Sequence, residues 1–306
     1  MSVKYHIIDS AGYNPTEDVD VIVSKNEYGK SNITVIGDML PRVWEESVIA
    51  TYEYGEDTRT MYDTLDAPTK NTCMTMVINH PWAEPSIHKA IPCGLEELET
   101  YRLEVCEGLH YDWIDHDDPQ KWQYNYYERI FAYPTVDDNT TDQFYAASNK
   151  LINNMETRRA NISIWDAKTD NDYEHPPCLQ IIDFSITRTT YEPTQFFLNT
   201  TVYMRSNCAM KAAAMNMFAF NSLAEKMADT IAAANPEWAH GEPISIGTYT
   251  HIANSYHIYG DYIAKGEYDA FKKLYDSREF ADRAYYSYDA TVKEIFKEAQ
   301  DKHYAK

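Results

Sequence analysis

Residues 179 to 204 limit the fold of this chain most strongly, because they contain two β-rich runs separated by a turn. In the first run Ile182, Phe184 and Ile186 fall on one face of an extended chain, and the polar residues between them fall on the other. The turn sequence RTTYEPTQ leads to a second β-branched and aromatic run, Phe196 to Met204. The two runs predict a β-hairpin.

A cysteine directly precedes this hairpin. Pro176 and Pro177 fix φ and cannot continue a helix, so Cys178 is predicted to lie on a stiff, extended entry into the first strand. The second run ends at Arg205 and Ser206, and a hairpin returns this end toward the start of the first strand. A guanidinium near a thiol lowers the thiol pKa. The pattern therefore favours a nucleophilic cysteine.

An apolar segment with helical spacing follows the hairpin. Its methionines and alanines recur every three or four residues, which predicts a closely packed helix. The recurring positions are Met210, Ala213, Ala214, Met217, Ala224, Met227, Ala228 and Ile231. Asn216 lies one step off this stripe, and a buried amide that finds no partner costs about 1–3 kcal/mol. Asn216 must therefore have polar partners, in the core or in a ligand.

These residues, taken in order, resemble the thymidylate synthase superfamily, which includes pyrimidine nucleotide hydroxymethylases of some bacteriophages. The shared pieces are PPC, RS, an asparagine on the next helix and H-x-Y, preceded by DQ, RR and a tryptophan. They stand at residues 176–178, 205–206, 216, 257–259, 142–143, 158–159 and 165. The local sequences PCLQ, KAA-x-MNMFA and HIYG are most similar to those of the phage-type dUMP hydroxymethylase branch. The resemblance spans about residues 120 to 262 and implies an α/β (α+β) fold, with a large mixed sheet at a dimer interface and flanking helices.

The resemblance implies a folate-dependent one-carbon transfer to C5 of a pyrimidine nucleoside monophosphate. Its hydroxymethylase branch converts dUMP to 5-hydroxymethyl-dUMP with 5,10-methylenetetrahydrofolate, a step of nucleotide biosynthesis in phage DNA modification. Cys178 would add to C6 of the base, because a thiolate is a nucleophile that adds and leaves readily. Tyr126 would assist proton removal from C5. The family's helix glutamate, which organises water at the base, would be Glu104, with Glu97 as the runner-up.

The resemblance also assigns the phosphate contacts. Arg158 and Arg159 would reach the phosphate bound to the other subunit, which implies a homodimer. Arg205 and Ser206 would hold the phosphate from the same subunit. Guanidinium forks suit this task because they form paired, charge-assisted hydrogen bonds to a phosphate dianion. A further phosphate contact nearer the N-terminus would be Arg59, with Lys70 as a substitute.

The remaining substrate contacts concern the base and the sugar. Asn216 would read the edge of uracil, because an amide can donate to O4 and accept from N3–H. Aspartate at this place marks the cytosine-specific branch, so asparagine implies dUMP. His257 and Tyr259 would bind the sugar hydroxyl.

The chain departs from ordinary thymidylate synthases at several positions. Where the family has RSxD, this chain has Arg205-Ser206-Asn207-Cys208, so the aspartate that fixes the folate ring is missing. Where the family has PCH, this chain has Pro177-Cys178-Leu179. These differences weaken the case for ordinary thymidylate synthesis. A divergent thymidylate synthase making dTMP, a non-catalytic nucleotide-binding relative and a cysteine hydrolase using Cys178 and His257 remain alternatives.

Charge and cysteine content bound the partners and the compartment. Forty-eight acidic and 27 basic residues give a formal charge of −21, which repels nucleic acid polymers and acidic membrane surfaces. Five cysteines without a CxxC pair argue against a disulfide framework or a zinc ribbon. We therefore expect a reducing compartment, the cytoplasm, which would be the host cytoplasm for a phage-encoded protein. No signal-peptide core or membrane-spanning apolar run is present in the sequence.

Length and patterning predict one domain over residues 1–306, because 44% of the residues are hydrophobic and no linker composition interrupts the chain. His110 and His116 lie among aspartates, and such loop acids are usually solvated, so we expect no metal site. Helices are predicted at 41–54, 94–109, 143–154 and from 268 onward as a surface element. Strands are predicted at 21–23, 33–36, 73–79 and 244–252.

Overall fold

Nine strands form a mixed sheet within residues 15–116, 118, 120–135, 139–190 and 192–304, which are the residues that the computed structural model describes. The bounds are Val19–Lys25 (β1), Ser31–Gly37 (β2), Glu56–Thr58 (β3), Thr69–Ile78 (β4), Asn161–Ser163 (β8), Leu179–Arg188 (β9), Phe196–Met204 (β10), Asn207–Cys208 (β11) and Ile244–Ile258 (β12). The strand order is β1-β2-β4-β12-β10-β9-β8, with β3 paired to β4 and β11 to β12. The predicted mixed α/β (α+β) fold is confirmed.

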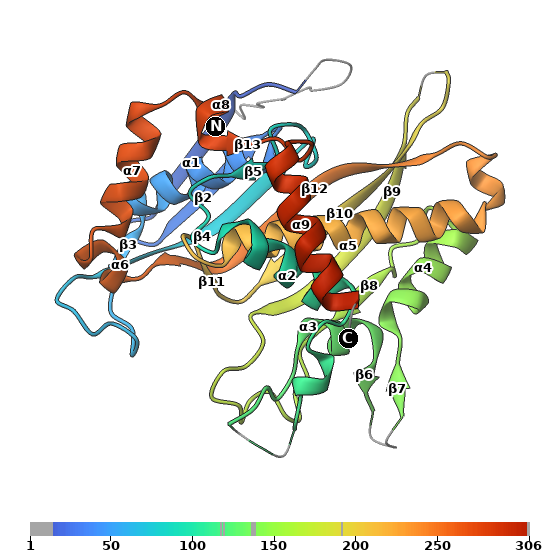
Figure 1. The fold of residues 1–306 in the computed structure, drawn as a ribbon, viewed down its shortest axis with the longest axis horizontal. Coiled ribbons are helices and arrows are strands. Elements are labelled where there is room, and N and C mark those ends of the chain that lie inside the picture. Colours follow the sequence, from blue (N-terminus) through green and yellow to red (C-terminus); the bar gives the residue numbers. More distant parts are fainter. Residues whose placement is uncertain (1–14, 117, 119, 136–138, 191, 305–306) are drawn as a thin grey trace.

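The helices are arranged against this sheet (Figure 1). Their bounds are Leu40–Tyr54 (α1), Gly94–Cys106 (α2), Tyr126–Phe131 (α3), Gln143–Asn153 (α4), Ala213–Ala234 (α5), Gly260–Ala264 (α6), Glu267–Ser277 (α7), Phe280–Arg283 (α8) and Ala290–Tyr304 (α9). α5 packs on β12 and β10, and α1 packs on β4 and β2. Small two-stranded sheets join β5 (Ile87–His88) to β13 (Ala284–Tyr285) and β6 (Tyr133–Pro134) to β7 (Thr140–Thr141). Short 3-10 turns cover Tyr111–Trp113 and Glu237–Ala239.

The predicted hairpin is confirmed as β9 and β10, which pair antiparallel with Phe196 opposite Arg188. Ile182, Phe184 and Ile186 are buried, and the polar residues between them are exposed. The face of β9 that carries Asp183, Ser185 and Thr187 is therefore the face turned away from the core. β10 continues the sheet through a parallel pairing with β12, and β9, which follows Cys178, lies between β10 and the short strand β8.

The predicted helices at the start of the chain and before the arginine pair match α1 and α4 closely. α2 ends at Cys106 rather than Leu109, because Gly108 adopts a left-handed conformation with φ +78° beneath the ring of Tyr127. The helical segment after the hairpin begins at Ala213, since residues 207–208 first pair with β12. β12 extends beyond Ile252 to Ile258 and carries His257.

One irregularity interrupts the pairing of β12 with β4. Ala253 pairs with Met74, whereas the next pair is Tyr256 with Thr72, so β12 has one more residue than β4 between these points. Such a bulge changes which face the following side chains occupy. Tyr256 is consequently buried among the core residues, although strict alternation from Ala253 would place Ser255 there.

The C-terminal helices are more than the surface element that the sequence predicts. Tyr268, Phe271, Phe280 and Val292 are buried, and α9 packs along α2. The ring of Phe271 meets Trp44 of α1 edge to face at 5.6 Å. These contacts fix α7, α8 and α9 to the helical layer.

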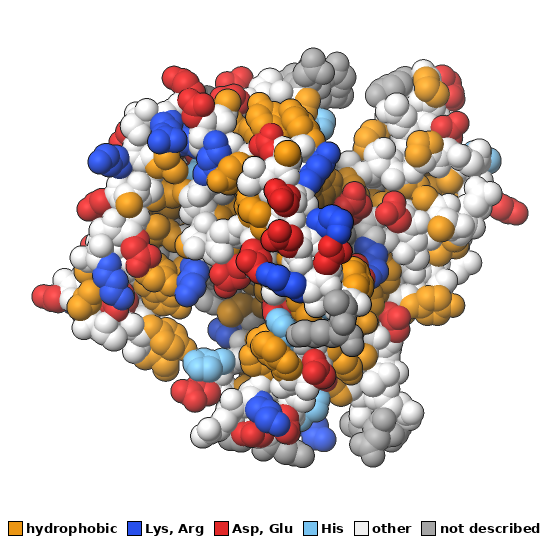
Figure 2. Space-filling view, in the orientation of Figure 1, with side chains coloured by type: hydrophobic (Ala, Val, Ile, Leu, Met, Phe, Trp, Pro, Cys, Tyr) orange, Lys and Arg blue, Asp and Glu red, His pale blue; other side chains and the backbone are white. Residues whose placement is uncertain are grey.

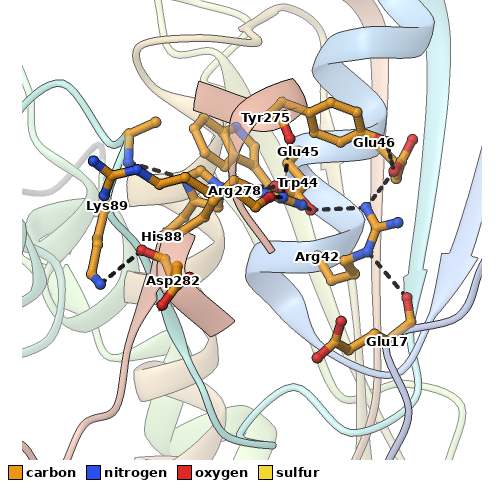
Figure 3. A network of polar contacts seen from close by, with 12 residues as sticks. Glu17, Arg42, Trp44, Glu45, Glu46, His88, Lys89, Tyr275, Arg278 and Asp282 are labelled. Carbon is orange, nitrogen blue, oxygen red and sulfur yellow. Dashed lines mark hydrogen bonds and ion pairs between the residues drawn. The ribbon is translucent and has the colours of Figure 1, made fainter. Parts of the chain in front are cut away.

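A buried polar network joins α1 to this C-terminal part (Figure 3). The carboxyl of Glu45 is fully buried and accepts hydrogen bonds from His88 Nε2 at 2.9 Å and from Arg283 Nε and Nη2 at 2.9 and 2.7 Å. Burial alone would raise the pKa of Glu45, but the bonds from His88 and Arg283 hold it below its ordinary value. Arg42 pairs with Glu45 and Glu46 beside this network.

Acidic and basic side chains are interspersed over the helical face (Figure 2). In the part of the chain that the structure describes, no helix has both the length and the apolar composition needed to cross a bilayer. The opposite sheet face carries partly exposed threonines and aliphatic residues, since one face of β4 and of β12 is only half-buried. Thr75, Val77, Thr250 and Ile252 belong to this face.

Candidate active site

The hairpin brings Cys178 and Arg205 together. The backbone N–H of Arg205 donates to the carbonyl oxygen of Cys178 at 2.8 Å. The guanidinium then turns back, and its Nε and Nη2 donate to the carbonyl oxygens of Pro177 and Pro176 at 2.9 and 2.7 Å. The stiff dipeptide before the thiol is thus held by the same arginine that follows β10. Ser206 is half-buried beside this arginine, between β10 and β11.

The thiol of Cys178 is partly buried and packs against the main core. Burial raises the pKa of Cys178 above its ordinary value, while the charge of Arg205 acts in the opposite direction. The sequence predicts the direction of the arginine's effect but not that burial outweighs it. The thiol is therefore mainly protonated at neutral pH, and a nucleophilic role would require a proton acceptor.

Tyrosines surround this thiol. Burial raises the pKa of Tyr101, Tyr124 and Tyr126, and the charge that Cys178 would carry as a thiolate adds to the shift in each case. The hydroxyl of Tyr126 accepts a hydrogen bond from the backbone N–H of Leu179 at 3.2 Å. Tyr126 is thus anchored at the residue after the thiol, as a neutral phenol that can donate a hydrogen bond or relay a proton.

Asn216 lies in the first turn of α5 and is buried. Its Oδ1 accepts a hydrogen bond from the Tyr101 hydroxyl at 2.6 Å, and its Nδ2 donates to Asn207 Oδ1 at 3.2 Å. The prediction that this amide has polar partners is therefore correct. Sequence reasoning missed Tyr101, because its place in the apolar stripe of α2 makes it resemble a core residue. Only its hydroxyl signals another role.

Glu104 lies about one turn after Tyr101 on α2. Its carboxyl is 2.6 Å from His110 Nδ1. Burial raises the pKa of Glu104, and the bond to His110 opposes this shift. Glu97, the runner-up, is exposed. Of the two glutamates, Glu104 is the one that faces the cavity next to the tyrosines.

That cavity has a volume of about 550 Å³ and lies between α2 and residues 121–126 and 172–175. Its lining combines aromatic rings with polar groups. The main contributors are Tyr101, Glu104, Trp122, Tyr124, Tyr126 and His175. Flat aromatic walls with a few polar groups are typical of sites for small planar ligands.

His257 provides an unsatisfied polar atom. It is buried, its Nδ1 lies 3.2 Å from the carbonyl oxygen of Ser255, and its Nε2 has no partner among the residues that the structure describes. Burial lowers the pKa of His257, so the imidazole is neutral. The ring of Tyr259 lies 4.5 Å away, edge to face, and burial raises the pKa of Tyr259 to about 12. A buried nitrogen without a partner invites a ligand hydroxyl.

The candidate N-terminal phosphate residues both have carboxylate partners. Arg59 is exposed and pairs with Asp66 at 2.5 Å, and Lys70 on β4 pairs with Asp57 at 2.5 Å. The loop after Arg59 is fixed near the H-x-Y motif, because the backbone N–H groups of residues 64 and 65 donate to Asp261 Oδ1. Arg59 would have to exchange Asp66 for a phosphate.

Arg158 and Arg159 lie in the loop between α4 and β8 and are exposed. Neither guanidinium has a hydrogen bond or ion pair with any residue placed by the structure. The Asp142-Gln143 pair, which precedes the two arginines in the chain, stabilises the local structure. Asp142 caps α4 by accepting from the N–H of Tyr145 at 2.8 Å, and Gln143 bridges the carbonyl oxygens of residues 129 and 163 at 2.7 Å.

The acidic loop histidines have other partners. His110 stacks on Trp113 at 3.7 Å, and His116 bonds Glu128 at 2.9 Å and the carbonyl oxygen of Gln123 at 2.8 Å. Over the ranges that can be described, no three His, Cys, Asp or Glu side chains gather as a metal ion requires.

Comparison with known proteins agrees with this geometry. The sequence profile of the family described as "Thymidylate synthase" matches residues 94–277, more than half of the chain. A protein of Methanocaldococcus jannaschii named "Putative thymidylate synthase" is 24% identical over 247 residues, which are 79% of this chain and 92% of that protein. A protein of the same name from Methanococcoides burtonii is 26% identical over 217 residues, 71% of this chain and 81% of that protein. The chain therefore belongs to the thymidylate synthase family, a family of one-carbon transferases.

Proposed function

We propose that this enzyme transfers a one-carbon unit to C5 of dUMP through a covalent bond between Cys178 and C6 of the base. The observation that supports this most directly is the placement of Cys178 against Arg205, within the ring of tyrosines that reaches Asn216. A thiolate adding to C6 makes C5 electron-rich, and its departure restores the ring. Because burial raises the thiol pKa, a neighbouring group must accept the thiol proton when Cys178 adds to C6.

The base and sugar contacts follow from the buried amide and imidazole. Asn216 has a second Nδ2 hydrogen and a second Oδ1 lone pair that can meet O4 and N3–H of uracil. His257 Nε2, which is buried without a partner in the described chain, would bind the sugar hydroxyl beside Tyr259. Both contacts use groups whose other hydrogen bonds already fix their position.

The phosphate would be held by Arg205 and Ser206 of one subunit and by Arg158 and Arg159 of a second copy, with Arg59 as a further contact. The exposed, unpaired arginine side chains on the loop before β8 support this arrangement. The half-buried face of the sheet, with its threonine and aliphatic side chains, would be the dimer interface. A homodimer would thereby complete each site.

The cavity lined by Tyr101, Tyr124 and Tyr126 would hold the one-carbon donor 5,10-methylenetetrahydrofolate. Trp122, Tyr124 and Tyr126 provide flat walls for a pteridine ring, and Glu104 and His175 provide polar atoms at its edge. The donor supplies a carbon at the oxidation level of formaldehyde. Cys208 stands where the family aspartate would bond the ring, so polar groups of the cavity must replace that contact.

The product we propose is 5-hydroxymethyl-dUMP. Glu104 lines the cavity with a carboxyl whose pKa is raised by burial and whose partner is His110. Such a pair can hold a water molecule and accept its proton. Tyr126, anchored beside Cys178, would assist removal of the C5 proton. Thymidylate synthesis is the second candidate, because the relatives from methanogens carry that name.

Incubation with dUMP and 5,10-methylenetetrahydrofolate, followed by mass analysis of the nucleotide, tests the proposal. We expect a product in which a hydroxymethyl group replaces the C5 hydrogen, a net gain of CH2O, together with release of tritium from [5-³H]dUMP and loss of both in Cys178→Ala. Formation of dTMP together with dihydrofolate would instead establish the second candidate. Binding of dUMP without any tritium release would identify a non-catalytic nucleotide-binding protein.

A further inference from the structure

A chain of buried polar side chains continues behind Asn216, away from the substrate side. Asn207 Nδ2 lies 2.9 Å from His251 Nε2, and His251 Nδ1 lies 3.0 Å from the hydroxyl of Tyr249. Asn207 is 3% exposed, and His251 and Tyr249 are fully buried. Together with Tyr101 and Asn216 they form a continuous series from α2 through α5 and β11 to β12, which we call the amide relay.

The protonation state of His251 determines which groups of the amide relay donate hydrogen bonds and which accept them. Burial lowers the pKa of His251 to about 3, so its ring is neutral, with one N–H and one lone pair. Asn207 Nδ2 can only donate, so His251 Nε2 accepts and Nδ1–H donates to Tyr249. Asn207 Oδ1 therefore faces Asn216 and accepts from its Nδ2.

The order of donors and acceptors in the amide relay determines how Asn216 is oriented toward the substrate. Because its Nδ2 is drawn toward Asn207, its Oδ1 faces the donating hydroxyl of Tyr101. This orientation is the one that accepts from N3–H of uracil and donates to O4. If His251 carried its proton on Nε2, Asn207 would have to turn its Oδ1 toward the ring, and Asn216 would turn over in response. A reversed Asn216 would match N3 and the N4 amino group of cytosine.

We propose that His251 is a positioning residue whose Nδ1–H tautomer, held by Tyr249, orients Asn216 and selects uracil over cytosine, an inference that rests on the proposed nucleotide site. Neither His251 nor Tyr249 contacts the base. They act because a buried amide side chain has two orientations of similar shape, which differ only in hydrogen bonding. A site built to hydrogen-bond one base edge rejects the other, since the mismatch leaves buried groups unpaired.

Tyr249→Phe is the most informative variant. It removes the acceptor of the His251 Nδ1–H bond and keeps the volume of the side chain, so the tautomer is no longer fixed. We expect the ratio of the dUMP and dCMP dissociation constants to move at least about tenfold toward dCMP, which corresponds to about 1.4 kcal/mol. His251→Phe should produce the same loss of selectivity.

Tyr256→Phe is the matched control. Tyr256 is on the same strand and fully buried, and its hydroxyl bonds Ser47 at 2.7 Å rather than the amide relay. It should lose stability comparably to Tyr249→Phe but keep the wild-type preference for dUMP. The binding of each nucleotide is measured by calorimetry, and folding by circular dichroism and thermal unfolding. A shift of selectivity in Tyr249→Phe that is absent in Tyr256→Phe is not a general effect of destabilisation.

The tautomer is read independently from the ¹⁵N shifts of His251 in wild-type protein. We expect a protonated Nδ1 and an unprotonated Nε2, unchanged by dUMP. A protonated Nε2, or an unchanged dUMP to dCMP ratio in Tyr249→Phe, would overturn the role of His251 while leaving the nucleotide site in place. Wild-type protein that binds neither nucleotide would refute the proposed function and, with it, this inference.

Discussion

Arg205 is bonded to Cys178 through the main chain, not through its guanidinium. The backbone N–H of Arg205 donates to the carbonyl oxygen of Cys178 at 2.8 Å. Its guanidinium donates to the carbonyl oxygens of the two prolines that precede the cysteine. The same residue therefore fixes the position of the candidate nucleophile and supplies a positive charge that lowers the pKa of its thiol. Only Nε and Nη2 of its guanidinium hold the prolines, so further N–H donors remain that can bind a phosphate.

The raised pKa of Cys178 predicts how its reactivity depends on pH. Because burial raises this pKa, the thiolate fraction at pH 7 is smaller than for a free thiol and grows as the pH rises toward and beyond 9. The rate of iodoacetamide modification at Cys178, followed by peptide mass analysis, should rise over this range. Arg205→Ala should move the profile to higher pH, because it removes the charge that lowers the pKa. A profile that moves to lower pH would contradict this reading of the site.

Asn216→Asp should exchange the preferred base. A carboxylate cannot donate to O4 of uracil, whereas a protonated carboxyl can both donate to N3 and accept from the amino group of cytosine. We expect dUMP binding to weaken by at least about tenfold, or 1.4 kcal/mol, and dCMP binding to strengthen. Calorimetric titration of both nucleotides into the variant measures this. Equal weakening of both would mean that Asn216 supports the fold without reading the base.

Activity should be restored by mixing inactive subunits if Arg158 and Arg159 act across an interface. A double variant, Arg158→Ala with Arg159→Ala, and the variant Cys178→Ala should each be inactive. In a dimer that exchanges subunits freely, half of the dimers become mixed and each holds one intact site, so about a quarter of wild-type activity returns. Mixing Arg205→Ala with Cys178→Ala is the control, because both act in the same subunit's site and no intact site arises.

Glu45→Gln should destabilise the fold without changing the site. Removing one partner of a buried charge network costs about 3–5 kcal/mol, because Arg283 is left without its carboxylate. Glu46→Gln is the control on the same helix. Its carboxyl is less buried than that of Glu45 and does not bond Arg283, so its loss should cost less than that of Glu45. Urea unfolding at neutral pH compares the two.

The same carboxyl predicts an acid sensitivity. The folded pKa of Glu45 is lowered, so its stabilising effect is present above the unfolded pKa and is lost as the pH falls through the folded value. Wild-type stability should therefore decline from about pH 5 downward, and Glu45→Gln should show a shallower decline. An equally steep decline in Glu45→Gln would assign the acid sensitivity to other carboxylates.

The sequence predicts much of the sheet because period-two patterning is local. Ile182, Phe184 and Ile186 show which face of β9 is buried, and the hairpin then brings Arg205 to Cys178. The apolar stripes likewise predict α1, α2, α4 and α5 within a few residues. Each of these features depends on neighbours in the chain, which is why a single sequence suffices.

Long-range polar pairing is what the sequence could not supply. Tyr101, Asn207 and His251 come from different elements, and none carries a motif that marks it as a partner of Asn216. The sequence also could not predict whether burial or the charge of Arg205 has the larger effect on the pKa of Cys178. Burial is a property of the packed fold. The same holds for the C-terminal helices, whose Tyr268 and Phe271 look like surface residues until α1 is packed against them.

The extra residue in β12 has a consequence for how this family member can vary. From Tyr249 to Ala253 the strand alternates regularly, and the bulge then exchanges the faces that Tyr256 and His257 would otherwise occupy. Deleting Asn254 would restore regular pairing, with Tyr256 still opposite Thr72 and His257 still opposite Asn71, so both side chains would keep their faces. The bulge therefore absorbs one residue of strand length, and a deletion confined to it is a change of length that β12 can accept without exchanging the faces of Tyr256 and His257.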